Sequence, residues 1–527
     1  MKAINVLLAL LVSVLIALGV FEGGLRLIGT GPTETINDFD EALGWSKRPG
    51  AVLNRATKEY DVTLEINDLG LREDPMTSAA KPDGTYRVLC LGDSFTLGYT
   101  VERRDLFVEQ LEMKWQAEGR SVDVLNAGTE GYSTDQEVVW LLENGDAFQP
   151  DLVLLFPYDN DIYWNGQKDY FGKQKPRFDQ AGRLDHQGPF TAPPEKGFFE
   201  SLAIGRLAQL FGGTAPQGHT YRPVGGSREL LSEFAPVVLP PTGFLTDAVL
   251  RTEGALIALK QKCDELGARL VVAPIPSHSS LEPEFGEAFA TQRLGLESLE
   301  NFHPDGPILT MLELCARNDI EALDSRQALK DAIESTGESM HYAVDWHLSP
   351  TGNRHFAEFL DASLVSSGVF PAEQAVTAET DFDLVLADLD QRPQMPGWIR
   401  WYVGLWIALT TLYYLTYKDE PAWQPPLKVG AMLGMIFTIV IGGTKLLALA
   451  PPQMAQGILI VFVLGILGFV IFKLGRRVST ILELLKAFTL RGHWYLMPLV
   501  TILLTIGSLL VVAASSPLVA PFIYTLF

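Results

Sequence analysis

The sequence predicts an α/β domain with a parallel five-stranded sheet, accompanied by α-helices that span a membrane. Two observations predict the sheet: five short runs rich in Val, Leu and Ile recur along the chain, and longer helix-like segments separate them. Strands that alternate with helices indicate βαβ units and therefore parallel pairing. A third observation, apolar runs of about 18 residues or more near both ends of the chain, is typical of membrane spans.

The elements of the sheet domain follow from this alternation. Strands are expected at 87–91, 122–126, 152–156, 269–274 and 320–323, and helices at 101–118, 134–148, 246–266, 308–317 and 350–366. In a parallel sheet covered on both faces, ligands bind at the carboxyl ends of the strands. The residues that directly follow each strand are therefore the first candidates for chemistry.

Changes in composition divide the chain into five parts. They are an N-terminal membrane anchor (1–29), a β extension (30–80), the α/β domain (81–367) with an insertion at 163–243, an acidic linker (368–397) and a four-span module (398–527). The β extension contains a stretch that alternates like a hairpin strand. The insertion is rich in Pro, Gly and aromatic residues, with a helix expected near 198–211, and it is read either as a wall of a substrate cleft or as a packing flap.

The apolar runs lie at 4–21, 401–417, 429–449, 456–472 and 494–514. A signal peptide is the alternative for the first run, but no small-residue cleavage site follows it, which favours an uncleaved anchor. The loops 418–428 and 473–493 carry the basic residues, so they are expected in the cytoplasm. This orientation predicts an integral protein of a bacterial-type inner membrane, with a cytoplasmic N-terminus and the α/β domain outside the cytoplasm.

Charge and cysteine content narrow the function. The formal net charge is −22, and residues 30–397 hold about 59 acidic against about 30 basic residues. Such an acidic domain argues against nucleic acid as a partner. The three cysteines, Cys90, Cys263 and Cys315, lie within apolar segments without metal-ligand spacing and are read as small core residues.

Polar residues with matching chemistry follow several of the predicted strands. Ser94 follows the first strand in "GDSFTLG", Gly128 and Gly131 follow the second, and Asn160 follows the third. Asp345 and His347 precede the last helix. A serine nucleophile needs a base to take its proton and donors to stabilise the oxyanion. Each residue alone is an ordinary turn residue, but together they supply a nucleophile, a base with its carboxylate, and amide donors. The remaining seven histidines are read as surface or core residues.

These segments resemble the four signature blocks of the SGNH (GDSL-type) hydrolase family. Two positions depart from the family pattern: Phe95 stands where Leu is common, and Tyr158 replaces the glycine before Asn160. Asp345 and His347 form D-x-H, where the family often has D-x-x-H. The resemblance covers roughly residues 40–366. The end of the chain is similar to a small membrane family of unknown function, which assigns no chemistry.

The resemblance implies a flavodoxin-like fold and a serine ester hydrolase with three catalytic residues, Ser94, His347 and Asp345. It implies an oxyanion hole formed by the backbone N–H groups of Ser94 and Gly131 and the side-chain amide of Asn160. No cofactor and no metal is expected. The expected substrate is an acylated small molecule or glycan, and membrane proteins of polysaccharide biosynthesis are possible partners.

Two alternatives remain open. The same residues would serve an O-acyltransferase, in which a sugar hydroxyl instead of water removes the acyl group from the serine. The chain could also be a non-catalytic membrane protein of polysaccharide assembly.

Overall fold

The computed structural model describes residues 35–193, 219–371, 382, 397–416, 421 and 423–434. The chain forms two compact units: one contains Pro32–Ser201 and Gly205–Gln391, and the other contains the two ends of the chain together with Leu202–Ile204. The expected helix near 198–211, the linker residues except 368–371, 382 and 397, and the apolar runs at 4–21, 456–472 and 494–514 lie outside the described residues.

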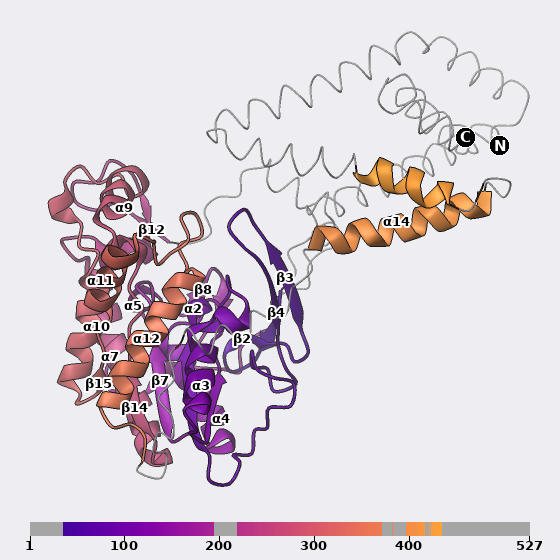
Figure 1. The fold of residues 1–527 in the computed structure, drawn as a ribbon. Helices are drawn as coiled ribbons and strands as arrows, with labels where there is room; N and C mark the ends of the chain where they lie inside the picture. Colours follow the sequence, from indigo (N-terminus) through magenta and orange to yellow (C-terminus); the bar gives the residue numbers. More distant parts are fainter. Residues whose placement is uncertain are drawn as a thin grey trace, which may run out of the picture. The chain divides into compact units, whose positions relative to one another are not determined.

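The first unit contains the predicted parallel sheet of five strands (Figure 1). Its strand order is β15 (Glu321–Ala322), β14 (Arg269–Val272), β7 (Leu152–Phe156), β5 (Tyr86–Gly92) and β6 (Val122–Asn126). All four pairings are parallel, with Val88 of β5 opposite Val124 on one side and Leu152 on the other. The predicted strands are therefore confirmed, and β6 and β7 have the predicted bounds.

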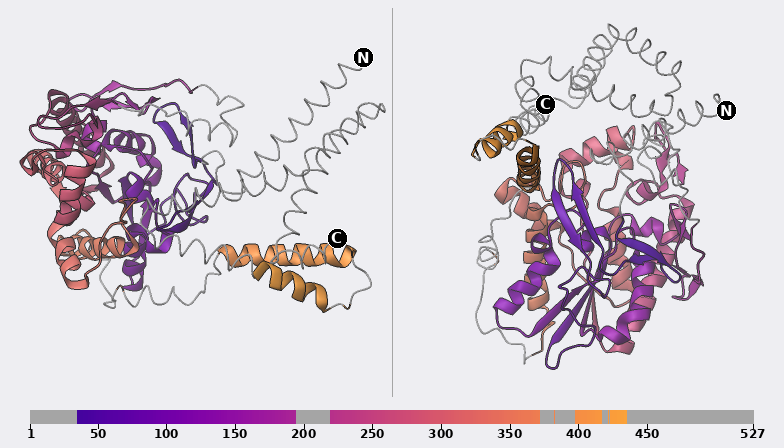
Figure 2. Two further views of the ribbon diagram at one scale, coloured as in Figure 1. Left: turned by 90° about the horizontal axis from the view of Figure 1, so that it is seen from above. Right: turned by 90° about the vertical axis from the view of Figure 1, so that its right-hand side faces the viewer.

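Helices cover both faces of this sheet (Figures 1 and 2). On one face, Leu89 and Leu91 of β5 pack in a core with residues of α4 (Thr134–Phe148), α7 (Gly243–Leu266) and α10 (Gly306–Arg317). On the other, Val88 and Cys90 pack with residues of α3 (Phe107–Ala117), α11 (Arg326–Thr336) and α12 (Pro350–Ser366). Successive residues of a strand point to opposite faces, so a strand buried on both sides is apolar throughout.

Four of the six covering helices match the predicted ones closely, and two do not. The predicted helix at 101–118 begins only at Phe107, because a 3₁₀ turn at Arg103–Asp105 and an extended Leu106 precede it. Helix α11 was not predicted, since its mean hydropathy is low and only Leu329 is buried. The three cysteines are free and buried, as expected of core residues.

The β extension forms two antiparallel hairpins. Strand β1 (Asn37–Asp40) pairs with β2 (Gly44–Lys47), and β3 (Val52–Ala56) pairs with β4 (Asp61–Glu65). Alternate residues of the second hairpin, such as Leu53, Val62 and Leu64, are buried in a small core of their own. This confirms the alternation that predicted a strand in this part of the sequence.

The described part of the insertion consists of short paired strands and a 3₁₀ segment, η2 (Ser232–Val237). Two further short helices follow β14, and a third follows β7. The strands of the insertion are β8 (Asp169–Tyr170), β9 (Lys173–Gln174), β10 (Arg177–Phe178), β11 (Leu184–His186), β12 (Thr220–Tyr221) and β13 (Leu230–Leu231). The three short helices are α5 (Asp161–Trp164), which follows β7, and α8 (His278–Leu281) and α9 (Pro283–Ala288), which follow β14.

In the second unit the structure describes α14 (Gly397–Thr416) and a helical segment at 424–434. Helix α14 coincides with the apolar run predicted at 401–417. The indole of Trp406 donates a hydrogen bond to the Pro426 carbonyl (2.7 Å), and the Tyr402 hydroxyl donates one to Gly430 (2.9 Å). Among the helices described here, none combines the length and the apolar character that a membrane crossing requires.

Candidate active site

Ser94, His347 and Asp345 form one hydrogen-bonded chain at the carboxyl end of β5. Ser94 is the first residue of the short helix α2 (Ser94–Leu97), and its Oγ lies 2.7 Å from Nε2 of His347. Nδ1 of the same imidazole lies 2.5 Å from Oδ1 of Asp345. With the Nδ1 proton donated to the carboxylate, Nε2 is left to accept the serine proton. This is the arrangement of a Ser–His–Asp triad.

The turn that presents Ser94 is held by Asp93. The Asp93 carboxylate accepts a hydrogen bond from the Phe95 N–H (2.8 Å) and so caps α2. Burial raises the pKa of Asp93 to about 6, although the Phe95 N–H and the charge of His347 favour its ionised form. The "GDS" signature therefore serves a structural purpose beside the serine, which is to fix the start of the helix.

The carboxylate of Asp345 stays ionised in spite of its partial burial. Burial alone would raise its pKa, but the hydrogen bond and charge of His347 and the hydrogen bond from Tyr60 together lower it below the ordinary value. An ionised Asp345 can hold the imidazole in the required tautomer and stabilise the imidazolium that forms during reaction.

The β3–β4 hairpin supplies two residues that hold Asp345. The Tyr60 hydroxyl donates a hydrogen bond to Asp345 Oδ2 (2.6 Å), and the two oxygens of Glu59 accept from the backbone N–H groups of Val344 and Asp345 (2.9 Å each). Burial, followed by the Asp345 carboxylate, raises the pKa of Tyr60, so the phenol remains a donor. Sequence reasoning missed both residues, and no local signal marks them, because they lie about 285 positions from the residues they contact.

Phe95 and Tyr158, the two departures from the pattern of the similar family, pack against each other, and Phe95 also packs against the imidazole. The Phe95 ring stacks on His347 (centroids 4.4 Å apart) and on Tyr158 (4.3 Å). A leucine and a glycine at these positions could not form this stack. Phe95 covers one face of the imidazole and Tyr158 packs on Phe95, which restricts the rotation of the imidazole.

The loop after β6 carries Gly131 and is clamped by the first hairpin. Lys47 donates hydrogen bonds to the Gly128 carbonyl and to the Thr129 hydroxyl (3.0 Å to the latter), and Trp45 donates one to Glu130 (3.1 Å). A Cβ at Gly128 would lie 2.4 Å from the Leu97 nitrogen, so only glycine allows the loop to approach α2 this closely. Gly131 has φ +75°, a conformation that also favours glycine.

Asn160 lies at the end of β7, directly before α5, on the wall of a cavity that His347 also lines. The next residue, Asp161, is fully buried and accepts a hydrogen bond from the Thr134 hydroxyl (3.1 Å). Burial, together with the charge of neighbouring Asp93, raises the pKa of Asp161 well above its ordinary value. This contact ties the segment that carries Asn160 to the start of α4.

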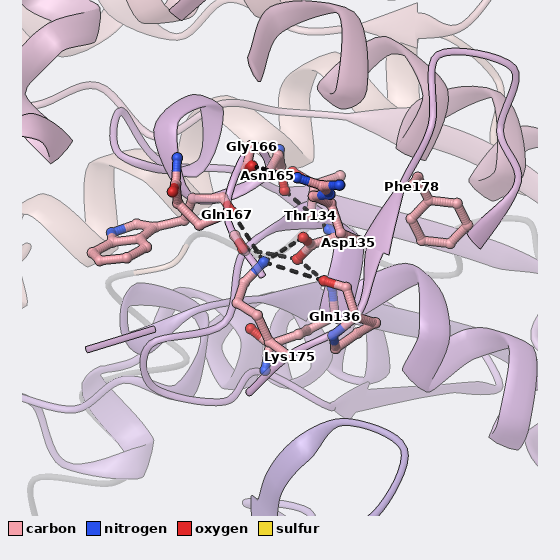
Figure 3. Close-up of polar contacts among 12 residues, drawn as sticks. Thr134, Asp135, Gln136, Asn165, Gly166, Gln167, Lys175 and Phe178 are labelled. Carbon is pink, nitrogen blue, oxygen red and sulfur yellow. Dashed lines mark hydrogen bonds and ion pairs between the residues drawn. The ribbon is translucent and has the colours of Figure 1, made fainter. Parts of the chain in front are cut away.

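A buried ion pair joins the insertion to α4 (Figure 3). Lys175, in the insertion, contacts Asp135 of α4 and donates to the Trp164 carbonyl (3.0 Å), and both side chains of the pair are almost completely buried. The side chain of Asn165 accepts from the Asp135 N–H (3.1 Å) and donates to Thr252 (3.0 Å). The insertion therefore helps to fix the loops on which Gly131 and Asn160 lie.

Trp346, between Asp345 and His347, has φ +68°. This left-handed conformation is rare for a bulky residue and costs about 1–3 kcal/mol. The left-handed residue lies at the middle position of the D-x-H segment, where Asp345 and His347, only two residues apart, must both point into the triad. Its side chain lines the cavity beside His347.

Within the described residues, one group of carboxylates has the spacing of a metal site: Glu73, Glu109 and Glu112. Each already has a partner. Glu73 accepts from the Asn126 N–H (2.8 Å), Glu112 from the Val124 N–H (3.2 Å), and Glu109 pairs with Arg103 (2.9 Å). The group joins α3 to β6, and we assign it no ion.

The fold and the site together define an α/β protein with a Ser–His–Asp triad of the kind that serine hydrolases use. The structure brings together Ser94, His347 and Asp345, places Asn160 on the wall of the same cavity, and places Gly131 in the neighbouring strand-end loop.

Comparisons with known proteins match two separate parts of the chain. Residues 478–527 match a family of unknown function (DUF5989), which agrees with the expected resemblance of this segment to a family without assigned chemistry. No sequence among the curated proteins matches the chain.

Several solved structures are similar to about half of the chain. A lipase/acylhydrolase from Enterococcus faecalis has 13% identity and a TM-score of 0.29, over 54% of this chain and 96% of that one. A member of the lipolytic protein G-D-S-L family from Veillonella parvula has 13% identity and a TM-score of 0.27, over 53% and 98%. An acetyl xylan esterase, AlAXEase, has 12% identity and a TM-score of 0.30, over 53% and 99%.

Proposed function

We propose that this protein is a membrane-anchored serine ester hydrolase that acts outside the cytoplasm on an O-acyl ester. One observation carries the proposal: the hydrogen-bonded chain from Ser94 through His347 to Asp345, at 2.7 and 2.5 Å. The first distance falls in the range that proton transfer between a nucleophile and its base requires, and the second is the hydrogen bond by which Asp345 orients that base. The strand-end position of the serine and the anchoring of Asp345 by Tyr60 support the same conclusion.

The proposed reaction has two steps, acylation of Ser94 and hydrolysis of the acyl-serine. Ser94 Oγ attacks the ester carbonyl while His347 Nε2 takes the serine proton, and the resulting oxyanion accepts hydrogen bonds from the Ser94 and Gly131 N–H groups and the Asn160 amide. When the carbon–oxygen bond to the alcohol breaks, His347 returns the proton to the leaving oxygen. A water molecule then attacks the acyl-serine, His347 takes its proton, and the carboxylic acid is released as Ser94 regains its hydrogen.

The location rests on the sequence. The N-terminal apolar run and the basic loops at 418–428 and 473–493 favour a catalytic domain outside the cytoplasm. An acylated cell-envelope or exported glycan is the substrate that suits this location. Protease treatment of right-side-out and inverted membrane vesicles tests the orientation: the 35–371 domain should be cleaved only where the outer surface is exposed.

Labelling of the full-length protein with a fluorophosphonate tests the chemistry. We expect one adduct, on Ser94, together with hydrolysis of p-nitrophenyl acetate, and we expect Ser94→Ala to lose both. A Ser94→Ala protein that keeps the wild-type rate would refute the mechanism. A folded wild-type protein that neither reacts with the fluorophosphonate nor cleaves the ester would favour the non-catalytic alternative.

Transfer of the acyl group to a sugar hydroxyl is the second candidate. The cavity beside His347 favours it, because an alcohol bound there would be activated by the same proton transfer that activates water. Mass spectrometry separates the two activities. A glycan that gains acyl groups from a donor ester indicates transfer, whereas an acylated glycan that only loses them indicates hydrolysis.

A further inference from the structure

A cavity of about 310 Å³ adjoins the triad and has a mixed lining. Its volume lies at the lower end of the range of about 300–1,000 Å³ that is usual for small-molecule sites. His347, Asp345 and Asn160 form part of its wall. The rest combines aromatic side chains with charged ones, and this combination limits what the cavity can hold.

The aromatic part of the lining centres on Trp346. This residue keeps a left-handed backbone, and the indole packs edge-to-face with Phe285 and Phe289, at centroid distances of 6.0 and 5.4 Å. The guanidinium of Arg293 lies 5.9 Å from the centre of the indole. An asparagine or glycine would adopt this backbone conformation with less strain, so the tryptophan is notable for the surface that it adds to the cavity.

The charged part of the lining would be poorly matched by an apolar ligand. Asp159 and Glu233 bring carboxyl groups to the cavity wall, and Arg293 brings a guanidinium group. Burial raises the pKa of Asp159 to about 7 and also raises the pKa of Glu233. An alkyl chain would offer no hydrogen bond to these carboxyl groups or to Arg293, which is costly in a desolvated site. Hydroxyl groups both donate and accept, so they suit the carboxyl groups and Arg293 alike.

The position of the cavity identifies the half of the ester that it faces. His347 delivers its proton to the leaving oxygen, so the alcohol half lies on the side of the imidazole. The cavity is lined by His347 and by the adjoining Trp346. Asn160, one of the oxyanion donors that receive the acyl carbonyl, lies on the same wall, so the reacting carbonyl borders the cavity and the alcohol half extends from it past His347 toward Trp346.

We propose that this cavity is the subsite for the alcohol half of the ester and that it takes a polyhydroxylated ring, the chemical class of sugars. One face of the ring lies against Trp346, and its hydroxyls pair with Asp159, Glu233 and Arg293. The inference rests on the proposed ester hydrolysis and adds to it the cavity and the residues that select a sugar as the alcohol.

Two acetate esters of matched size test the subsite in the full-length protein. One is methyl 6-O-acetylglucopyranoside, used with its 2-, 3- and 4-O-acetyl isomers, and the other is cyclohexylmethyl acetate, which has a ring of the same size without hydroxyls. We expect the wild-type kcat/KM to be at least tenfold higher for one of the sugar esters. Trp346→Ala and Arg293→Gln should each reduce this ratio at least fivefold, mainly through KM of the sugar ester, and Trp346→Phe should retain most of it.

Phe39→Leu is the matched control, because Phe39 is a partly exposed aromatic residue of β1 that is not among the residues lining the cavity. Its substrate ratio should equal that of the wild type. A wild-type enzyme that prefers cyclohexylmethyl acetate, or cleaves both esters equally, would overturn the subsite. So would equal losses on both esters in Trp346→Ala and Arg293→Gln.

Failure of the subsite can be told apart from failure of the proposed function. If Ser94 reacts with a fluorophosphonate and p-nitrophenyl acetate is cleaved, but no sugar ester is preferred, only the subsite is wrong. If Ser94 does not react and no ester is cleaved, the hydrolase itself is wrong, and the subsite falls with it.

Discussion

The hydrogen bond from Tyr60 to Asp345 gives the most specific test of how this site is built. Tyr60→Phe removes one hydroxyl and keeps the ring, which packs against Tyr342 with centroids 5.3 Å apart. Without the Tyr60 hydroxyl, the Asp345 carboxylate should be held less firmly in its orientation. Because that carboxylate orients His347, the variant should react more slowly without binding a small ester less tightly.

The size of the effect follows from the environment of the carboxylate. A hydrogen bond to a charged group contributes about 1.5–3 kcal/mol. The Asp345 side chain is 22% exposed, so water can replace part of the lost interaction. We therefore expect a loss near the lower end of the range, about 1.4 kcal/mol, which corresponds to a tenfold fall in kcat. The pKa of Asp345 should rise toward its ordinary value, which leaves it ionised at neutral pH.

The assay is the hydrolysis of p-nitrophenyl acetate by the full-length protein from pH 6 to 9. We expect kcat to fall about tenfold at every pH, KM to stay within twofold, and the rate of Ser94 labelling by a fluorophosphonate to fall by the same factor. Tyr86→Phe is the control, since it also deletes one tyrosine hydroxyl. That hydroxyl donates to the carbonyl of Val369 (2.7 Å), which follows α12, and not to a residue of the triad.

Wild-type kcat in a correctly folded Tyr60→Phe protein would refute the positioning role. Equal losses of activity in Tyr60→Phe and Tyr86→Phe, in proportion to a lowered melting temperature, would show that the Tyr60 hydroxyl acts on stability only.

Three further predictions concern an oxyanion donor, the buried ion pair and a buried carboxyl group. Asn160→Ala should lower kcat for p-nitrophenyl acetate by about 10²–10³, as expected for the loss of an oxyanion donor, and a fall of less than threefold would exclude that role. Lys175→Met should lower the free energy of unfolding by about 3–5 kcal/mol in chemical denaturation, because it leaves the Asp135 carboxylate buried without its cation. Adding Asp135→Asn should restore most of the lost stability. A double variant as unstable as Lys175→Met would contradict the ion-pair explanation. Burial raises the pKa of Glu112 from 4.5 to about 7. Between these pH values the folded state therefore holds a proton that the unfolded state has lost. The stability that the protonated Glu112 provides, on the order of 3 kcal/mol, is lost as the pH rises through 7. Glu112→Gln should therefore melt at a higher temperature than the wild type at pH 8 but not at pH 4.5, and a difference in melting temperature that is the same at both pH values would contradict the assignment.

The sequence by itself determined the sheet and the strand-end residues. Buried parallel strands are continuous apolar runs, and amphipathic helices must cover them, so β6, β7, α4 and α12 could be located from hydrophobic pattern alone. Ser94 could be proposed because residues after parallel strands share one edge of the sheet.

The sequence also located Asp345 and His347, through their position before α12 and the resemblance to a known family. It did not identify α11, which buries little apolar surface, or the late start of α3 behind an extended Leu106. The apolar residues of α11 are few, although their spacing is amphipathic, and the late start of α3 follows from a turn that hydrophobic spacing does not mark.

Only the tertiary structure revealed what surrounds the triad. Tyr60 and Glu59 contact the Asp345 segment from about 285 residues away, and Lys47 reaches the loop after β6 from about 81. No periodicity or spacing encodes such contacts, because they arise when separate elements pack. The left-handed backbone of Trp346 and the cavity that its side chain lines follow from the same packing. The reactive residues could thus be predicted one strand at a time, whereas their orientation and the surface offered to the substrate depend on the whole fold.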